Sequence, residues 1–331
     1  IIGGNTMDFT QIIGHENIIN NLQNTIANGK IAHSYLFEGE ESMGKKMVAL
    51  SFAKTLLCKE QKLEPCNNCN SCLKFDSFNH PDFKLIEPEG NLIRRNEIAN
   101  IIKKVNIAPL ESNRRIIVID DSHKIGMEGQ NALLKTLEEP PSYINIILIT
   151  SNSNMIIPTI LSRCERIKFH SIESEKTEEL LINKYNKTVD EAKFIVHFTK
   201  GSVGQAIYLS ETQDFFEKRK KTIEIIDSII KGDKYKAFDS YEFFANNKEN
   251  YEEILDIMIY WFRDLILYKE LGNTDLLLNK DKIDILSNQV FLKENKINDI
   301  IENIGNAKQD IQRKVNYQLT IETMLLKMQE V

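Results

Sequence analysis

The sequence predicts an α/β domain built on a parallel sheet, followed by a second part that is entirely helical. A loop containing two glycines, residues 39–45, separates a short apolar β-type run from an apolar helical pattern. Two runs rich in β-branched residues, 116–119 and 144–150, are almost wholly apolar, as strands buried on both faces are. From Ser174 onward only helical patterns remain. The alternation of strands and helices before that point indicates a sheet covered by helices on both faces.

The composition is that of an ordinary globular protein. The chain has 331 residues, of which 42% are apolar and 27% charged. Its 7 prolines and 14 glycines are few, which favours long helices over an all-β fold. The formal net charge of -6 argues against a protein that coats nucleic acid, although it leaves room for a local basic patch. No apolar run reaches the roughly 20 residues of a membrane span, and no secretory signal is visible, so we expect a cytoplasmic protein.

The elements of the first part can be placed in order. Residues 1–7, which lead up to Met7, are interpreted as an addition ahead of the natural chain and carry no weight. Asn96 is the predicted N-cap of one of the helices, with Glu97 in its first turn. The expected order is a helix within 8–30, a strand at 35–37, a helix to about residue 58, a strand at 83–86, a helix at 96–105, a strand at 114–119, a helix at 128–139 ended by two prolines, a strand at 144–150, a helix ending near residue 161 and a strand at 166–169.

The loop between the first strand and its helix has the spacing of a phosphate-binding loop. Gly39, Gly44 and Lys45 follow the pattern in which backbone N–H groups, a helix N-terminus and a lysine surround an anion. The next position departs from the pattern, because Lys46 stands where a Ser or Thr hydroxyl would ligate Mg²⁺. The sequence thus predicts a nucleotide-type architecture that lacks a part of the hydrolytic machinery. The plain alternative is a glycine turn with no ligand.

Polar residues follow the two buried strands of this part. Asp120 and Asp121 come after the strand at 114–119. Ligands of open α/β sheets bind at the carboxyl ends of the strands. In nucleotide hydrolases such an acid assists Mg²⁺, and a second one, usually Glu, orients the attacking water. Thr150, Ser151 or Asn152 could sense a γ-phosphate, and the sequence does not distinguish them. Solvated side chains at strand ends are the alternative interpretation.

Four of the five cysteines lie within fifteen residues of one another. Two C-x2-C pairs, which share Cys69, place thiolates on tight turns with the separation that tetrahedral Zn²⁺ requires. A closed shell of four thiolates leaves no position for water, so the zinc would be structural. We therefore predict a zinc module over residues 58–72, with little positive charge for contacting nucleic acid. Its ligands are Cys58, Cys66, Cys69 and Cys72.

The second part is expected to begin with three short helices, at 175–184, 189–198 and 202–209, and to continue with long amphipathic ones. Apolar residues at helical spacing indicate the core of a helical bundle. The basic run Lys218–Lys221 is expected on a solvated helix face. The core stripes are Ile254, Ile257, Met258, Trp261, Leu265 and Tyr268; Ile297, Ile300, Ile301 and Ile304; and, more loosely, Val315, Leu319, Met324 and Leu325.

Taken together and in order, these motifs resemble bacterial clamp-loader subunits of the AAA+ class. The resemblance covers about residues 8–210, and the helical remainder fits the family's collar domain in length only. It implies an AAA+ α/β domain over 8–168, a three-helix lid over 169–210 and a helical collar or oligomerisation domain over 211–331. The motifs are HSYLF at 33–37, the loop at 39–45, the four cysteines, Asp120-Asp121 after Ile119, NALLKTLEEPP at 131–141 and LSRC at 161–164.

Two branches of that family compete. In the ATPase branch (gamma/tau), the loop ends in Lys-Thr, the acidic pair is Asp-Glu, and the lid carries an arginine after Gly-Ser. Here those positions hold Lys46, Asp121 and Gly204, yet Arg163 is retained. The sequence therefore looks like the delta-prime branch, in which this arginine is supplied as a finger to the nucleotide of a neighbouring ATPase subunit.

The resemblance implies a non-hydrolysing subunit of the DNA polymerase III holoenzyme, without ATPase activity of its own. Its partners would be gamma/tau and delta subunits in a hetero-oligomer that loads the sliding clamp onto primed DNA, with no membrane involved. Binding of ATP or ADP at the degenerate loop is left open. One alternative is an active ATPase subunit, which a turnover assay on the pure chain would reveal. Another is a zinc-dependent nucleic-acid module, whose DNA affinity would fall when zinc is chelated.

Overall fold

The computed structural model describes residues 7–90, 92–212, 214–232, 234–272, 274 and 276–329. Apart from Met7, the segment interpreted as an addition, residues 1–7, lies outside the described residues. The chain divides into two compact units. One contains the residues up to Lys176 together with Lys200–Gln205, and the other contains Thr177–Thr199 and the residues from Ala206 onward.

The first unit is built on a five-stranded sheet in the order β2-β3-β4-β1-β5. Every neighbouring pair runs parallel, so the connections between strands must cross over the sheet. In the centre, Ser34 is paired with Ile146 and Glu38 with Thr150. The strands are β1 (Ser34–Glu38), β2 (Phe83–Ile86), β3 (Arg115–Ile119), β4 (Ile144–Thr150) and β5 (Glu165–Lys168).

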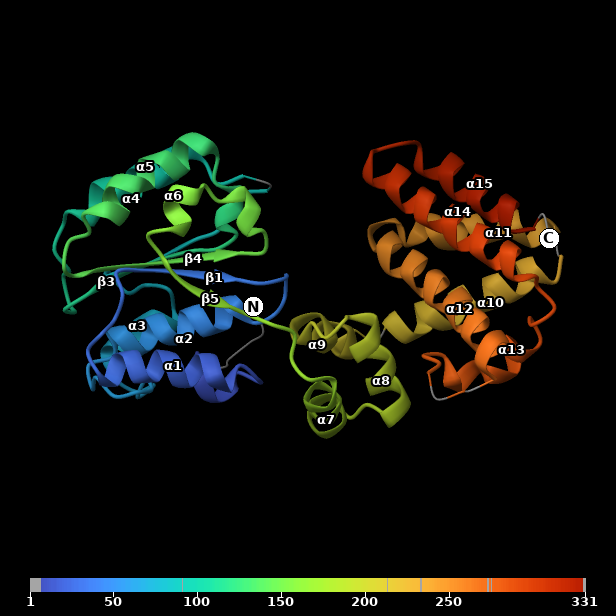
Figure 1. Cartoon of the computed structure of the whole chain (residues 1–331), viewed down its shortest axis with the longest axis horizontal. Coiled ribbons are helices and arrows are strands. Elements are labelled where there is room, and N and C mark those ends of the chain that lie inside the picture. The colour runs from blue at the N-terminus through green and yellow to red at the C-terminus, as the bar shows by residue number, and fades with distance from the viewer. Residues whose placement is uncertain are drawn as a thin grey trace. The chain divides into compact units, whose positions relative to one another are not determined.

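Helices cover both faces of this sheet, as Figure 1 shows. On β1, Tyr35 and Phe37 point to one helical layer, whereas Leu36 points to the other. This alternation follows from the pleat of a strand and explains why buried strands are apolar throughout. One layer contains α1 (Glu16–Ala27), α2 (Lys45–Leu57) and α3 (Asn70–Asp76), and the other contains α4 (Arg95–Val105), α5 (Met127–Glu138) and α6 (Pro158–Leu161). Single 3-10 turns are η1 (Phe9–Gln11), η2 (Ser122–Lys124) and η3 (Ser153–Met155).

The predicted cap of α4 is wrong by two residues. The helix already begins at Arg95, so Asn96 lies within its first turn. Glu97 carries out part of the capping instead, because its carboxylate accepts a hydrogen bond from the backbone N–H of Arg94 at 3.2 Å. A glutamate that reaches back to the N-terminus of its own helix has the same effect as the second residue of a capping box.

The rest of the chain is helical, which confirms the predicted class of a parallel-sheet α/β domain followed by an all-α part. Among the described helices, none is long and apolar enough to cross a membrane. The helices are α7 (Ser174–Tyr185), α8 (Val189–Phe198), α9 (Val203–Glu211), α10 (Asp214–Ile230), α11 (Lys234–Asn246), α12 (Tyr251–Leu271), α13 (Ile283–Ser287), α14 (Glu294–Gln312) and α15 (Tyr317–Gln329), with 3-10 turns η4 (Lys248–Asn250) and η5 (Lys280–Lys282).

The core of the helical bundle confirms two of the predicted stripes and corrects the third. Most residues of the stripes on α12 and α14 are buried in one cluster, which includes Trp261 and Ile300, with Tyr268 and Ile301 partly buried against it. Ile257 is buried in a second cluster. In the third stripe, Met324 and Leu325 are buried as predicted, but Val315 and Leu319 are 47% and 62% exposed. The reason is that α15 begins only at Tyr317, and its buried stripe runs from that residue through Ile321, at a spacing of four. A residue two positions after Tyr317 lies on the opposite side of the helix.

The basic run at 218–221 is only half solvated, contrary to the prediction. Lys218 and Arg219 are buried, whereas the two lysines that follow are exposed. The Arg219 guanidinium donates to Asn279 Oδ1 at 2.8 Å, pairs with Asp281, and lies 4.2 Å from the centre of the Phe194 ring. Successive helical residues are about 100° apart, so four consecutive residues cannot all lie on the solvated face of a packed helix, and here the first two lie on the buried face. Arginine tolerates that place because its charge is paired and its plane stacks on an aromatic ring.

Candidate functional site

The predicted phosphate loop connects β1 to α2 and depends on its glycines. Gly39 has φ +155° and Gly44 has φ +82°, in the region that favours glycine. A Cβ on Gly39 would also lie 2.7 Å from the carbonyl oxygen of Phe169, which follows β5. The loop is therefore a tight strand-to-helix connection at the carboxyl edge of the sheet, as the sequence predicted.

Lys45 is folded back onto its own loop. Its side chain is buried, and its Nζ donates to the carbonyl oxygen of Gly39 at 2.7 Å and to that of Glu40. Burial lowers the pKa of Lys45, and the nearby carboxylates of Asp120 and Asp121 counteract part of this effect. In this arrangement the lysine holds the loop closed through backbone carbonyls.

Lys46 lies against the carboxylate that the sequence pattern assigned to Mg²⁺. Its Nζ is 3.0 Å from Asp120 Oδ2 and also pairs with Glu87, which follows β2. Burial alone would lower the pKa of Lys46, but the hydrogen bonds and charges of Glu87 and Asp120 outweigh burial and raise it. A permanent positive charge thus stands at the end of β3. Sequence analysis identified the substitution at position 46 but not the partner at position 87.

The remaining predicted polar residues lie at the same edge of the sheet. Asp121 has φ +45°, and its carboxylate pairs with Lys124 at 2.8 Å. The Thr150 side chain is fully buried, and its Oγ1 accepts a hydrogen bond from the backbone N–H of Asn152 at 3.0 Å. The Thr150 carbonyl oxygen accepts from the N–H of Gly39, which brings the end of β4 next to the phosphate loop. Ser151 is half-buried and Asn152 is exposed, so the three candidate sensors differ mainly in burial.

The four clustered cysteines converge on one point beside α3. Their sulfur atoms all lie within 4.8 Å of one another. Cys69 is the N-cap of α3, where its sulfur accepts from the backbone N–H of Cys72. Burial opposes ionisation of the Cys69 thiol, but hydrogen bonds from the N–H groups of Cys72 and Lys59 lower its pKa, whereas burial raises the pKa of Cys72. These four residues could hold a metal ion.

Arg163 follows α6 and is partly exposed rather than enclosed by its own fold. Its side chain is 33% exposed, and its backbone carbonyl accepts from the Ser34 hydroxyl at 2.7 Å. One guanidinium nitrogen, NH1, donates to the carbonyl oxygen of Thr159 at 2.8 Å and to the hydroxyl of Ser162. The other, NH2, pairs with Glu138 at 2.7 Å. Glu138 lies in the sequence motif at 131–141, but nothing in the sequence pattern indicates that it pairs with Arg163.

Comparison with known proteins shows the family. The family described as "DNA polymerase III, delta subunit" matches residues 14–173, and "DNA polymerase III, delta subunit, C terminal" matches residues 213–330. The DNA polymerase III subunit gamma of Buchnera aphidicola subsp. Schizaphis graminum is 31% identical over 322 residues, which are 92% of this chain and 86% of that protein. The chain belongs to the family of DNA polymerase III clamp-loader subunits.

One further relative agrees with this assignment, and one solved structure shares the fold. The DNA polymerase III subunit delta' of Bacillus subtilis is 29% identical over 313 residues, or 93% of this chain and 94% of that protein. A solved structure of a DNA polymerase III gamma subunit-related protein from Thermotoga maritima superposes with a TM-score of 0.51 at 18% identity. The superposition covers 94% of this chain and 98% of the Thermotoga maritima chain. At that identity the second likeness concerns the fold alone.

In this clamp-loader chain, the position that the resemblance assigned to a lid arginine is packed against the phosphate loop. The backbone N–H of Gly204 donates to the carbonyl oxygen of Ser42 at 3.0 Å, and the Ser202 hydroxyl donates to the same oxygen. A Cβ on Gly204 would lie 2.8 Å from that oxygen. The start of α9 is therefore hydrogen-bonded to the loop at a place where only glycine fits. Sequence analysis recognised the missing arginine but not this contact.

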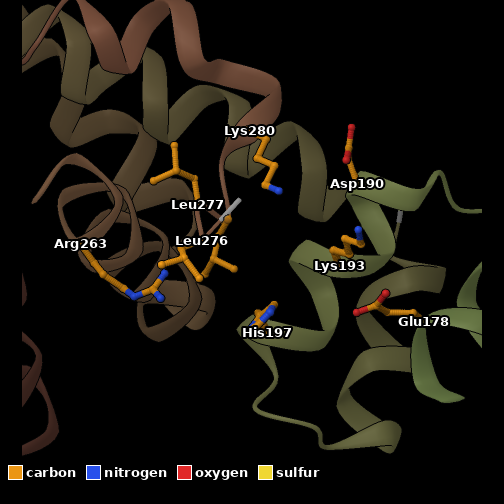
Figure 2. Close-up of a pocket in the computed structure, with 9 residues that line it drawn as sticks. Glu178, Asp190, Lys193, His197, Arg263, Leu276, Leu277 and Lys280 are labelled. Carbon is orange, nitrogen blue, oxygen red and sulfur yellow. The ribbon is translucent and has the colours of Figure 1, made fainter. Parts of the chain in front are cut away.

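The pocket drawn in Figure 2 is a separate feature of the second unit. It has a volume of about 240 Å³ and mixes charged residues of α7, α8 and α12 with Leu276–Leu278. In Figure 2, His197 and Lys193 on α8 face the leucine segment across the opening. None of the predicted site residues lines it.

Packing at Gly204 gives a stability test. We expect Gly204→Ala to reduce the free energy of unfolding by about 1–3 kcal/mol, because the new methyl group overlaps the Ser42 carbonyl. Gly305→Ala is the matched control, since nothing lies within 4 Å of a Cβ at Gly305 inside α14. It should be neutral or stabilise by about 0.5–1 kcal/mol. Urea unfolding followed by circular dichroism measures both, and equal effects of the two substitutions would contradict the packing described here.

Proposed function

We propose that this chain is a non-hydrolysing, delta-prime-like subunit of the DNA polymerase III clamp loader, which supplies Arg163 to the nucleotide of a neighbouring ATPase subunit. The observation that carries the proposal is the ammonium of Lys46 beside Asp120, at the position where hydrolysis requires a metal-ligating hydroxyl. In the nucleotide hydrolases of the phosphate-loop class, Mg²⁺ is held by that hydroxyl and by the strand acid.

The electrostatics of the loop support the absence of hydrolysis. A divalent cation approaching Asp120 would have to displace Lys46, which is held by Glu87 as well. The second acid, Asp121, is paired with Lys124 and is one methylene shorter than the glutamate that usually orients the attacking water. Two separate requirements of the reaction are thus altered within one site, while the loop that surrounds the phosphates retains its glycines and Lys45.

The accessibility of Arg163 supports its action on another subunit. Its guanidinium is partly exposed and lies beyond the end of α6, on a chain that has no hydrolysis of its own to assist. An arginine supplied in trans stabilises the charge that develops on a transferring phosphoryl group, and in well-studied cases it raises the rate by about 10³–10⁵.

The proposed organisation follows the family. Residues 8–168 form the AAA+ domain, 169–210 the lid and 211–331 the collar, which would assemble with gamma/tau and delta subunits. Matches to delta, delta' and gamma sequences support such a mixed complex. Contact with the sliding clamp and with primed DNA would then be made through the assembled loader.

We propose further that the four cysteines bind structural Zn²⁺. At a Zn–S distance of about 2.3 Å, the sulfurs of a tetrahedral site lie roughly 3.8 Å apart, and a spread of up to 4.8 Å needs little adjustment. The loop that contains them is also anchored to the domain. Asn67, between two of the cysteines, accepts from Lys54 Nζ at 2.7 Å and donates to Asp8 at 3.0 Å. When bound, the ion would cross-link this loop to α2 and α3.

The zinc proposal predicts a loss of stability without metal. Cys66→Ser, or a chelator, should remove one bound zinc per chain. Either should lower the free energy of unfolding by about 2–5 kcal/mol, as for loss of a cross-link in a small module. Cys164→Ser is the control, because Cys164 is the cysteine outside the cluster. Zinc content by atomic emission and the midpoint of thermal unfolding are the readouts. A purified chain that contains no zinc and is indifferent to chelators would overturn the assignment.

The isolated chain should not hydrolyse Mg²⁺-ATP above background. If it binds ATP, its affinity should change less than about twofold when Mg²⁺ is removed, because Lys46 occupies the position of the metal. Titration calorimetry with and without Mg²⁺, together with a phosphate-release assay, measures both properties. Lys46→Thr restores the hydroxyl and should make any affinity dependent on Mg²⁺. Rapid turnover by the unaltered pure chain would instead indicate an active ATPase subunit. The 31% identity with a gamma subunit supports that alternative.

The role of Arg163 requires the assembled loader for its test. Arg163→Ala should slow ATP hydrolysis at the adjoining site by about 10³-fold or more, so that the complex retains only the rate of its other sites. Lys168→Ala, a change of an exposed cation on β5, is the matched control and should leave the rate unchanged. The assay is steady-state phosphate release in the presence of clamp and primed DNA. An undiminished rate in an Arg163→Ala complex of normal composition would refute the finger.

A further inference from the structure

The arginine proposed to act on a neighbour is held by a carboxylate of its own chain. Glu138 Oε1 lies 2.7 Å from Arg163 NH2, while Thr159 and Ser162 accept bonds from NH1. These contacts join the end of α5 to the residues that follow α6. The guanidinium is therefore already oriented in the isolated chain, with a negative charge directly against it.

Without its pair to Arg163, the carboxylate of Glu138 would destabilise the end of α5. Glu138 is the last residue of α5, where the helix dipole disfavours negative charge, and Glu139 adds a second carboxylate next to it. The guanidinium of Arg163 offsets both effects. A lysine or arginine at the C-terminus would stabilise a surface helix through the helix dipole. Glu138 therefore does not contribute to the stability of α5 by itself.

The exposure of the pair allows it to be exchanged. The side chains of Glu138 and Arg163 are 47% and 33% exposed. Ion pairs of this kind contribute little to stability because water and salt screen them. A phosphate oxygen offers the same guanidinium a charge-assisted contact of the same kind, and a triphosphate brings several negative charges, which attract Arg163 and repel Glu138. A nucleotide presented by a neighbouring subunit would thus compete directly with Glu138 for Arg163.

We propose that Glu138 is a positioning residue that acts as the resting counter-ion of Arg163. It holds the guanidinium in place while no triphosphate faces it, and it is displaced when one arrives. The inference rests on the proposed role of Arg163. Its consequence is that the affinity of the adjoining site for ATP includes the cost of breaking the pair with Glu138, whereas the rate of the chemical step, after displacement, does not.

The test uses the loader assembled with clamp and primed DNA, with KM for ATP and kcat measured separately. Glu138→Gln keeps the shape and a hydrogen-bonding oxygen but removes the charge. It should lower KM about two- to fivefold and leave kcat within a factor of two. The difference in KM should shrink at high salt, because the ion pair is screened. Glu139→Gln, the exposed neighbour, is the control and should change neither constant.

A double substitution separates this inference from the proposed function. Because the Arg163→Ala complex turns over only at its other sites, the comparison in that background uses equilibrium binding of a non-hydrolysable ATP analogue. Glu138→Gln should tighten that binding when Arg163 is present and have no further effect in the Arg163→Ala background, because there is no guanidinium to release. An equal effect in both backgrounds, or an unchanged KM in the single variant, would overturn the role of Glu138 while Arg163 could still be a finger. A single Arg163→Ala variant with the full rate would instead remove the proposed function itself.

Discussion

The arrangement of charges at the carboxyl edge of the sheet depends on one ion pair, between Lys46 on α2 and Asp120 after β3. In hydrolases of this architecture, a divalent cation joins the start of that helix to the end of that strand. Here an ammonium makes the connection within the chain, and Glu87 adds a second strand end, that of β2, to it. The ammonium offsets part of the charge of the two carboxylates and holds the helix to the sheet. A covalently attached cation satisfies the structural part of the metal's role, but it cannot bridge two phosphate groups as a multiply coordinated ion does.

The topology of the sheet explains why these residues meet. β1 lies between β4 and β5, and β3 is next to β4, so the loop after β1, Thr150 at the end of β4 and Asp120 after β3 share one edge. Because all strands run parallel, each of their carboxyl ends contributes to the same surface. The backbone of this edge therefore does not depend on any single polar side chain that it carries, since the apolar pairing of the strands does not involve those side chains.

The features that could be predicted from the sequence are those that a short segment determines by itself. The strands β2 and β4 and the helix α8 were predicted with the bounds they have, because continuous apolar runs and helical spacing are properties of short segments. Contacts between distant segments were not accessible in this way. Nothing in the spacing of residues pairs Lys46 with Glu87, or Arg163 with Glu138, because these partners are 41 and 25 positions apart and meet only through the sheet and its crossovers. The burial of Arg219 was missed for a related reason. A run of four basic residues suggests solvent, but the helical period places two of them inward, and their partners come from another segment.

A single helix connects the two predicted sites of the first unit. α2 begins with Lys45 and Lys46 at the phosphate loop, and two turns further along it carries Lys54, whose side chain is fully buried. A buried ammonium is tolerated only when it is paired, and Lys54 is bonded to Asp76 on α3 and to Asn67 among the cysteines. The loop of cysteines is thus fixed by a charge on the same helix that carries the phosphate loop at its N-terminus. Disorder in that loop would leave the Lys54 charge incompletely paired inside the domain and would disturb the helix on which Lys46 stands. The carboxyl edge of the sheet and the loop of cysteines are therefore parts of one cooperative structure rather than independent additions to the sheet.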